Sequence, residues 1–135
     1  MLQHHQLVTA YSALENVLLP MLDGTGQASA AMHARARALI ERVGLASCLH
    51  RRAGLLDIAQ QQRVAVARAL ALAPPLLLAD EPTGNLDSTG AAALVELLLD
   101  LSREQSTTVL LVSTNASLAS GRSRTLHLVG GRVDG

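Results

Sequence analysis

A short apolar run that ends in two adjacent acids is the feature that most narrows the fold of this chain. Leu76 to Ala79 contain no polar residue, and Asp80 and Glu81 follow directly. An apolar run without alternation is typical of a strand covered on both faces, as in a parallel sheet. In an open parallel sheet, ligands bind at the carboxyl ends of the strands. The sequence therefore predicts an α/β fold in which Asp80 and Glu81 face a ligand site.

Composition excludes several other classes of protein. The 135 residues include 11 Lys+Arg and 11 Asp+Glu, so the formal net charge is zero, and Tyr11 is the only aromatic residue. We therefore expect no nucleic-acid partner, because such binding relies on positive charge and aromatic stacking. Cys48 is the only cysteine, which excludes an internal disulfide. We also expect no signal peptide and no direct membrane insertion, because Arg68 and the prolines at 74–75 interrupt the most apolar region.

The residues up to about 59 are predicted to be helical. A capping-box pattern at Ser12 to Glu15 predicts a short helix that ends near Met21. A longer amphipathic helix is expected to stop at Gly44, followed by a helical turn over 45–49. Its apolar stripe consists of Met32, Ala36, Leu39, Ile40 and Val43, and its outer face, expected to be solvated, consists of Arg35, Arg37, Glu41 and Arg42.

Helices and strands alternate in the second half of the chain. An Ala-rich helix over 60–73 is expected to end at the proline pair, and a second helix is expected over 88–105. Strands are expected over 76–79 and 107–113, and a terminal strand over 124–133 is expected to turn at the glycine pair 130–131. Alternation of this kind predicts half of an α/β sheet.

Three segments together carry a resemblance to a known family. The segment LLLADEPTGNLDS (76–88) resembles the Walker B segment and D-loop of the ATP-binding subunits of ABC transporters. QQQRVAVARALALAP (60–74) is similar to the helix after their signature motif, and SALENVLLP (12–20) to the segment after their Q-loop, particularly in the lipoprotein-releasing and macrolide-efflux types. The resemblance covers essentially the whole chain.

The resemblance implies a fold and a domain division. The implied fold is the C-terminal part of a P-loop (RecA-like) ATPase domain, with its helical subdomain and an incomplete parallel sheet. Residues 1–59 correspond to the Q-loop and helical subdomain, up to the signature. Residues 60–135 correspond to a partial α/β core with Walker B, the D-loop and the H-loop position.

The resemblance also implies roles for individual residues. Gln3 matches the Q-loop glutamine, Asp80 the residue that holds Mg²⁺ through water, and Glu81 the general base. ATP and Mg²⁺ are the implied cofactors. The D-loop positions are Asn85, Leu86 and Asp87.

The signature motif departs from the family pattern LSGGE/Q. Asp57 stands where the family has the serine that contacts the γ-phosphate bound by the opposite subunit, and Ile58 replaces a glycine. Asp57 can still cap a helix, but two unit charges about 4 Å apart repel by roughly 1 to 4 kcal/mol. We expect these residues to cap and pack rather than to bind phosphate. The five signature positions are Leu56, Asp57, Ile58, Ala59 and Gln60.

Two further departures affect the handling of ATP. Thr114 stands at the switch-histidine position, and threonine does not titrate near neutral pH. All 11 Lys+Arg residues are arginines, so the sequence contains no Walker A loop with its lysine. We therefore expect an N-terminally truncated form that lacks the main source of nucleotide-binding energy.

The parent activity implied by the resemblance is ATP hydrolysis coupled to export. It is carried out by a dimer of ATP-binding subunits on the cytoplasmic face of an inner-membrane permease. The leading hypothesis is that this chain is a truncated, inactive subunit. The alternatives are a non-hydrolysing or regulatory module that docks on an intact subunit or permease, and a split ATPase whose front half is a separate polypeptide.

The implied sheet is open at one edge. By analogy with related ATPase sheets, the strand over 107–113 would lack its neighbour on one side. An apolar strand with an unpaired edge favours aggregation. We therefore expect marginal solubility or self-association.

Overall fold

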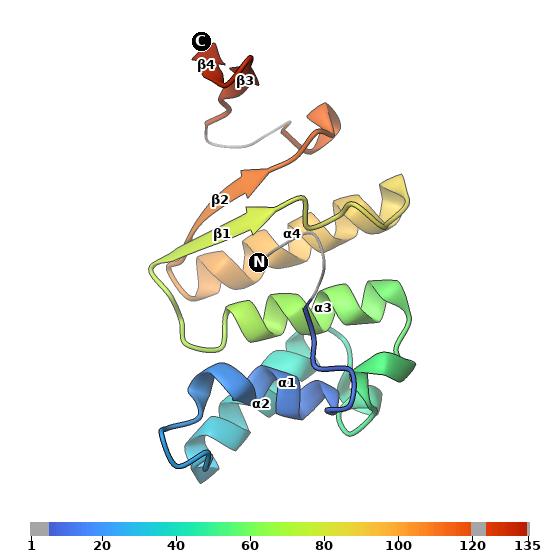
Figure 1. Ribbon diagram of the computed structural model, residues 1–135, viewed down its shortest axis with the longest axis vertical. Coiled ribbons are helices and arrows are strands. Elements are labelled where there is room, and N and C mark those ends of the chain that lie inside the picture. Colours follow the sequence, from blue (N-terminus) through green and yellow to red (C-terminus); the bar gives the residue numbers. More distant parts are fainter. Residues whose placement is uncertain (1–5, 120–123, 135) are drawn as a thin grey trace.

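The computed structural model describes residues 6–119 and 124–134, in which four helices precede or alternate with short strands (Figure 1). The α-helices are α1 (Ala13–Leu18), α2 (Ala30–Arg42), α3 (Ile58–Ala69) and α4 (Ser88–Glu104). The strands are β1 (Leu76–Asp80), β2 (Thr108–Val112), β3 (His127–Val129) and β4 (Arg132–Asp134). Single 3-10 turns are Leu19–Met21, Ala46–Cys48, Ala53–Leu55 and Ala116–Ala119.

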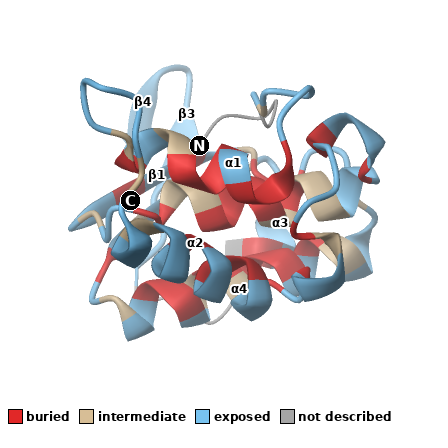
Figure 2. Ribbon diagram, turned by 90° about the horizontal axis from the view of Figure 1, so that it is seen from below, coloured by how far each residue is buried: buried red, intermediate tan, exposed pale blue. Residues whose placement is uncertain are grey.

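The helix α3 lies between the first two helices, α1 and α2, and the part of the molecule that contains α4 and the parallel strands. It contacts α1 and α2 on one side and α4 on another, and α4 in turn contacts β2. The buried residues of these elements form one hydrophobic cluster, seen as red segments of α1, α3 and α4 in Figure 2. β1 and β2 are parallel, with Leu77 opposite Val109. The predicted α/β fold with a short parallel sheet is confirmed.

Most predicted elements are present, with shifted ends. Ser12 caps α1 in a capping box, as expected, and Gly44 follows α2 with a φ of 76°. The Ala-rich helix ends at Ala69 rather than at residue 73, and Ala73 takes a φ of 47°. Leu70 already leaves the helical conformation, with a φ of −94° and a ψ of 0°, and the Ala73 N–H closes a turn on the Leu70 carbonyl (3.0 Å) before the prolines. The terminal segment forms the antiparallel hairpin β3–β4.

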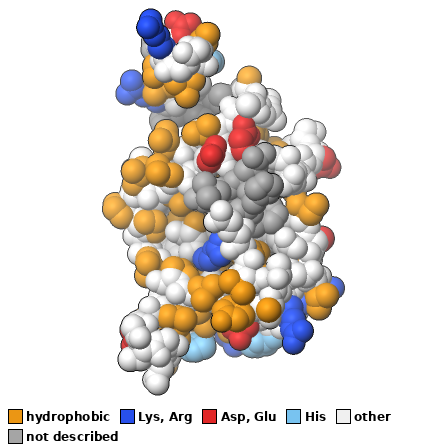
Figure 3. All heavy atoms as spheres, viewed as in Figure 1, with side chains coloured by type: hydrophobic (Ala, Val, Ile, Leu, Met, Phe, Trp, Pro, Cys, Tyr) orange, Lys and Arg blue, Asp and Glu red, His pale blue; other side chains and the backbone are white. Residues whose placement is uncertain are grey.

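The expectation that β1 is covered on both faces is wrong. Leu77 and Ala79 are buried toward the helices, whereas residues that alternate with them are exposed. In Figure 3 hydrophobic side chains gather at the level of the two strands. The sheet therefore presents one open apolar face. This face is formed by Leu76, Leu78, Leu110 and Val112, each 45% to 55% exposed.

Two arginines of the outer face of α2, Arg35 and Arg42, are exposed as expected and also bond to groups outside α2. The Arg35 guanidinium donates to the Ala71 carbonyl (2.5 Å) and the Leu70 carbonyl (3.1 Å) past the end of α3, and to the Gln105 side-chain oxygen (3.0 Å) after α4. Carbonyls at a helix C-terminus lack intrahelical partners and carry partial negative charge, which favours a cation there. Arg42 pairs with Glu104.

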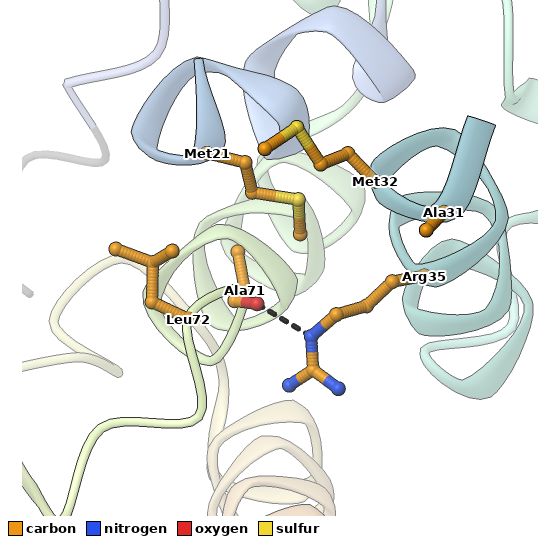
Figure 4. A pocket seen from close by; sticks show the side chains of 6 residues that line it. All are labelled: Met21, Ala31, Met32, Arg35, Ala71 and Leu72. Atoms are coloured by element: carbon orange, nitrogen blue, oxygen red, sulfur yellow. Dashed lines mark hydrogen bonds between the residues drawn. The ribbon is translucent and has the colours of Figure 1, made fainter. Parts of the chain in front are cut away.

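Arg35 also borders a shallow cavity of about 310 Å³ between α2 and the residues that follow α3. Figure 4 shows Met21 and Met32 on one side of it and Leu72 on another, with the Arg35 bond to Ala71 closing the rim. The cavity is therefore mainly apolar, with a single charged side chain that is already bonded.

A fully buried asparagine holds the segment before α1. The Asn16 side-chain oxygen accepts the Val8 N–H (2.8 Å), and its amide donates to the carbonyls of Val8 (3.0 Å) and Ser12 (3.0 Å). The Val8 N–H thereby gains an acceptor outside any helix, and the two carbonyls, which already accept the N–H groups of Tyr11 and Asn16, gain a second donor. Asn16 thus fixes the path by which the chain enters α1.

Replacing this asparagine is expected to destabilise the fold. Asn16→Ala leaves the Val8 N–H without its acceptor, whereas the carbonyls of Val8 and Ser12 keep a main-chain donor each, so we expect the free energy of unfolding to fall by about 1 to 3 kcal/mol. Urea unfolding followed by circular dichroism measures this. Asn85→Ala, at an exposed position, is the control and should change stability by less than about 0.5 kcal/mol. Equal effects of the two changes would contradict the assignment.

The capping box of α1 predicts a pH dependence. The Ser12 N–H and hydroxyl, each 2.7 Å from the Glu15 carboxylate, lower the pKa of Glu15 below its ordinary 4.5. A lowered pKa contributes stability above the unfolded value, and this contribution is lost as the pH falls through the folded pKa. The stability advantage of the wild type over Glu15→Gln should therefore be present near pH 6 and disappear in acid. Urea unfolding at a series of pH values tests this, and an advantage that persists in strong acid would refute it.

The open face of the sheet predicts self-association and dye binding. Leu110→Thr should lower both the binding of the dye ANS and the apparent mass in analytical ultracentrifugation, because it removes apolar surface while keeping a residue that favours strands. Leu128→Thr makes the same change on the exposed hairpin and should have a smaller effect. A monodisperse wild-type monomer that binds no ANS at high concentration would contradict the prediction.

Candidate functional site

The two acids after the apolar run lie at the C-terminal end of β1. Asp80 is the last residue of the strand and is exposed, and Glu81 is half-buried. Glu81 has a φ of 41°, in the left-handed region that residues other than glycine rarely occupy. Such strain persists only where the surroundings hold the residue in place, and it gathers at functional sites.

Three hydrogen bonds tie Glu81 to the end of β2. Its own N–H donates to the Val112 carbonyl (2.9 Å). Its carboxylate accepts the Thr114 N–H at 2.5 Å and the Ser113 hydroxyl at 3.2 Å. The structure thus brings together the general-base and switch positions expected from the sequence. The contact uses the main chain of Thr114, not its side chain.

The D-loop residues connect β1 to α4. Asn85 is exposed, and Leu86 packs against the core. Asp87 caps α4 by accepting the Gly90 N–H at 2.7 Å. A Cβ at Gly90 would lie 2.9 Å from the capping oxygen, so a larger residue there would require a small shift of the Asp87 carboxylate. The loop is therefore fixed at its helical end.

The signature positions form the N-terminal end of α3. Leu56 is buried, and the carboxylate of Asp57 accepts the Gln60 N–H at 2.8 Å, while the Gln60 side chain accepts the Asp57 N–H at 3.2 Å. This is the capping box expected from the sequence. Ile58 is 51% exposed, and Ala59 is also exposed. The helix end therefore already holds a carboxylate, which is a poor fit for an incoming phosphate.

The described residues offer limited ligands for a metal ion. Within residues 6–119 and 124–134, no group of three or more His, Cys, Asp or Glu side chains could hold one. Asp80 alone supplies an exposed carboxylate at the strand end, so any Mg²⁺ there would depend on water or a partner for its other ligands. Gln3, the expected Q-loop residue, lies outside the described residues.

The sequence analysis missed two residues that the structure makes important. Ser113 bonds to Glu81, and nothing in the composition of its strand distinguishes it from a residue that merely ends the strand. Asn16 is buried within the segment SALENVLLP, and its signal was available. A polar residue among the apolar residues of a short helix, here Leu14, Val17 and Leu18, indicates a side chain that needs partners in the core. In the described part of the chain, no helix is long and apolar enough to cross a membrane.

Comparisons with known proteins identify the family and the fold of this chain. The family model described as ABC transporter matches residues 1–84. The lipoprotein-releasing system ATP-binding protein LolD 1 of Rhodopseudomonas palustris is 48% identical over 133 residues, which cover 98% of this chain and 59% of that protein. LolD of Anaeromyxobacter dehalogenans is 47% identical over 131 residues, covering 97% and 55%.

A solved structure gives the same result for the fold. The dimeric ATP-binding cassette MJ0796, in a post-hydrolysis state bound to ADP and Pi, matches with a TM-score of 0.80 and 36% identity over 98% of this chain and 58% of that one. The chain thus spans a little more than half the length of the relatives it matches. Because the family model covers more than half of the chain, this protein belongs to the ABC transporter family, among its ATP-binding domains.

Proposed function

We propose that this chain serves the ATP-binding side of an exporting ABC transporter in a form that does not hydrolyse ATP by itself. The similar proteins are named as ATP-binding components of lipoprotein-releasing systems. In the family, ATP binding and hydrolysis are coupled to export through a permease. The residues of this chain at the signature and switch positions favour a role without turnover.

The observation that carries the proposal is the carboxylate at the start of α3. A helix N-terminus with free N–H groups attracts anions. Here the Asp57 carboxylate takes the Gln60 N–H at 2.8 Å, and a phosphate at the same place would meet a like charge. That repulsion amounts to roughly 1 to 4 kcal/mol at about 4 Å. The half-exposed side chain of Ile58 also lies where an anion would approach the backbone.

The other assignments follow as parts of the same proposal. Residues 1–59 act as the Q-loop and helical subdomain, and 60–135 as the partial core. Asp80 would hold Mg²⁺ through water, and Glu81 would accept a proton from water if a partner supplied Mg–ATP. The proposed partners are a second ATP-binding subunit and an inner-membrane permease, with the chain on the cytoplasmic face. The remaining proposed positions are Gln3, Thr114 and the D-loop residues Asn85, Leu86 and Asp87.

The open face of the sheet favours a second candidate function. Parallel sheets are almost always covered on both faces, whereas β1 and β2 expose leucine and valine side chains on one. A module that docks on an intact ATP-binding subunit or permease through this face, and regulates it without hydrolysis, would cover that surface. The same face would also suit a split cassette assembled from two polypeptides.

The proposal predicts no ATP turnover by the purified chain. Phosphate release with millimolar Mg–ATP should not exceed the blank, and the thermal midpoint should not move, whereas ligand at 100 times its Kd adds about 2.7 kcal/mol. Release that Glu81→Gln abolishes would refute the proposal, because a contaminating ATPase would survive that change.

A pair of variants at Asp57 tests whether its carboxylate caps α3, as the proposal assumes. Asp57→Ser keeps a capping oxygen and should preserve stability, whereas Asp57→Ala should cost about 1 kcal/mol. If the two variants melt alike, the carboxylate does not cap α3 and the argument from the occupied helix end fails.

A further inference from the structure

The loop that follows β2 contains a hydrogen-bond network that the proposed function does not require. We propose that Ser113 is a positioning residue that orients the Glu81 carboxylate, and that the main chain at residue 114 completes this hold whatever side chain stands there. The inference rests on the proposed role of Glu81, since positioning matters only if that carboxylate acts on water.

The direction of the Ser113 hydroxyl is set by its neighbours. A serine hydroxyl has one hydrogen to donate and two lone pairs that accept. The Asn115 N–H donates to the Ser113 oxygen at 3.1 Å, which occupies one lone pair. The hydroxyl hydrogen is then free to point at the Glu81 carboxylate oxygen 3.2 Å away. Ser113 therefore links the main chain of the loop, at the Asn115 N–H, to the Glu81 carboxylate through two hydrogen bonds.

Both carboxylate oxygens are held, by different donors. Oε2 faces the Ser113 hydroxyl, and Oε1 accepts the Thr114 N–H at 2.5 Å. Two donors on two oxygens prevent the carboxylate from rotating about its last bond. A carboxylate has about four acceptor sites, so this arrangement leaves about two of them for water. The hold orients Glu81 without using up its capacity to accept a proton.

The backbone of Glu81 is strained, and the side-chain hydrogen bonds from Ser113 and Thr114 help to keep the residue in place. A φ of 41° is unfavourable for glutamate, and the bond from its N–H to the Val112 carbonyl accounts for only the backbone. The side-chain bonds fix the rest of the residue against the end of β2. Because one of them comes from a main-chain N–H, any residue except proline at position 114 supplies it.

The test is hydrogen exchange of the Thr114 amide in the ¹⁵N-labelled full chain, without nucleotide. Ser113→Ala removes one of the two donors that orient the carboxylate, so the remaining bond to the Thr114 N–H should weaken and exchange of this amide should accelerate about tenfold. Ser113→Thr keeps the hydroxyl and should restore the wild-type rate and amide chemical shift. Ser117→Ala is the matched control, because that hydroxyl bonds to Asn115 in the same loop and not to Glu81.

Two outcomes would overturn the inference. One is a wild-type exchange rate in Ser113→Ala, and the other is an equal acceleration in Ser117→Ala, which would indicate general loosening of the loop. If Ser113→Ala fails to fold, Glu81→Gln replaces it, since a neutral acceptor should weaken the same amide bond. Because no ATP is present, failure here is separate from failure of the proposed function, which the phosphate-release assay reports.

Discussion

The side chains of α3 are buried on several sides, and this burial joins the two parts of the chain. Val64, Val66 and Leu70 are fully enclosed between α1 and α2 on one side and α4 on the other. Each such side chain contributes about 1.5 to 3 kcal/mol when it is removed from water. Both ends of the helix are also satisfied, by Asp57 at its start and by Arg35 past its end. The placement of β1, and so of the acids at its end, follows from this helix.

The two acids at the centre of the functional argument share a physical property. Asp57 and Glu81 each accept main-chain N–H groups of their own chain. In an anion-binding site such N–H groups would be free to meet a ligand. At Asp57 the result is an occupied helix end, whereas at Glu81 it is an oriented carboxylate with acceptor capacity to spare. The same kind of bond therefore favours a signature position that does not bind phosphate and a carboxylate that is ordered at the end of β1.

The sequence predicted the local structure well, because capping residues and apolar periodicity act over a few neighbours. Ser12 and Asp57 cap helices as their patterns indicate. Contacts between distant segments were not predictable. The role of Arg35 depends on carbonyls about 35 positions away, and that of Ser113 on a carboxylate 32 positions away. The coverage of β1 was predicted wrongly, because an apolar run does not reveal what packs against its second face. For the site, the sequence predicted roles for Glu81 and residue 114 but not the main-chain bond that joins them.

The central position of α3 also determines how the chain comes apart. Residue 59, where the helical part gives way to the core by resemblance, is the second residue of this helix. A cut there would divide a helix whose side chains contribute to both neighbours. The helical layer and the strands therefore belong to one cooperative folding unit, and neither is expected to survive as a fragment. The exposed β3–β4 hairpin lies outside that unit, so it can fray or be trimmed by a protease while the rest remains folded.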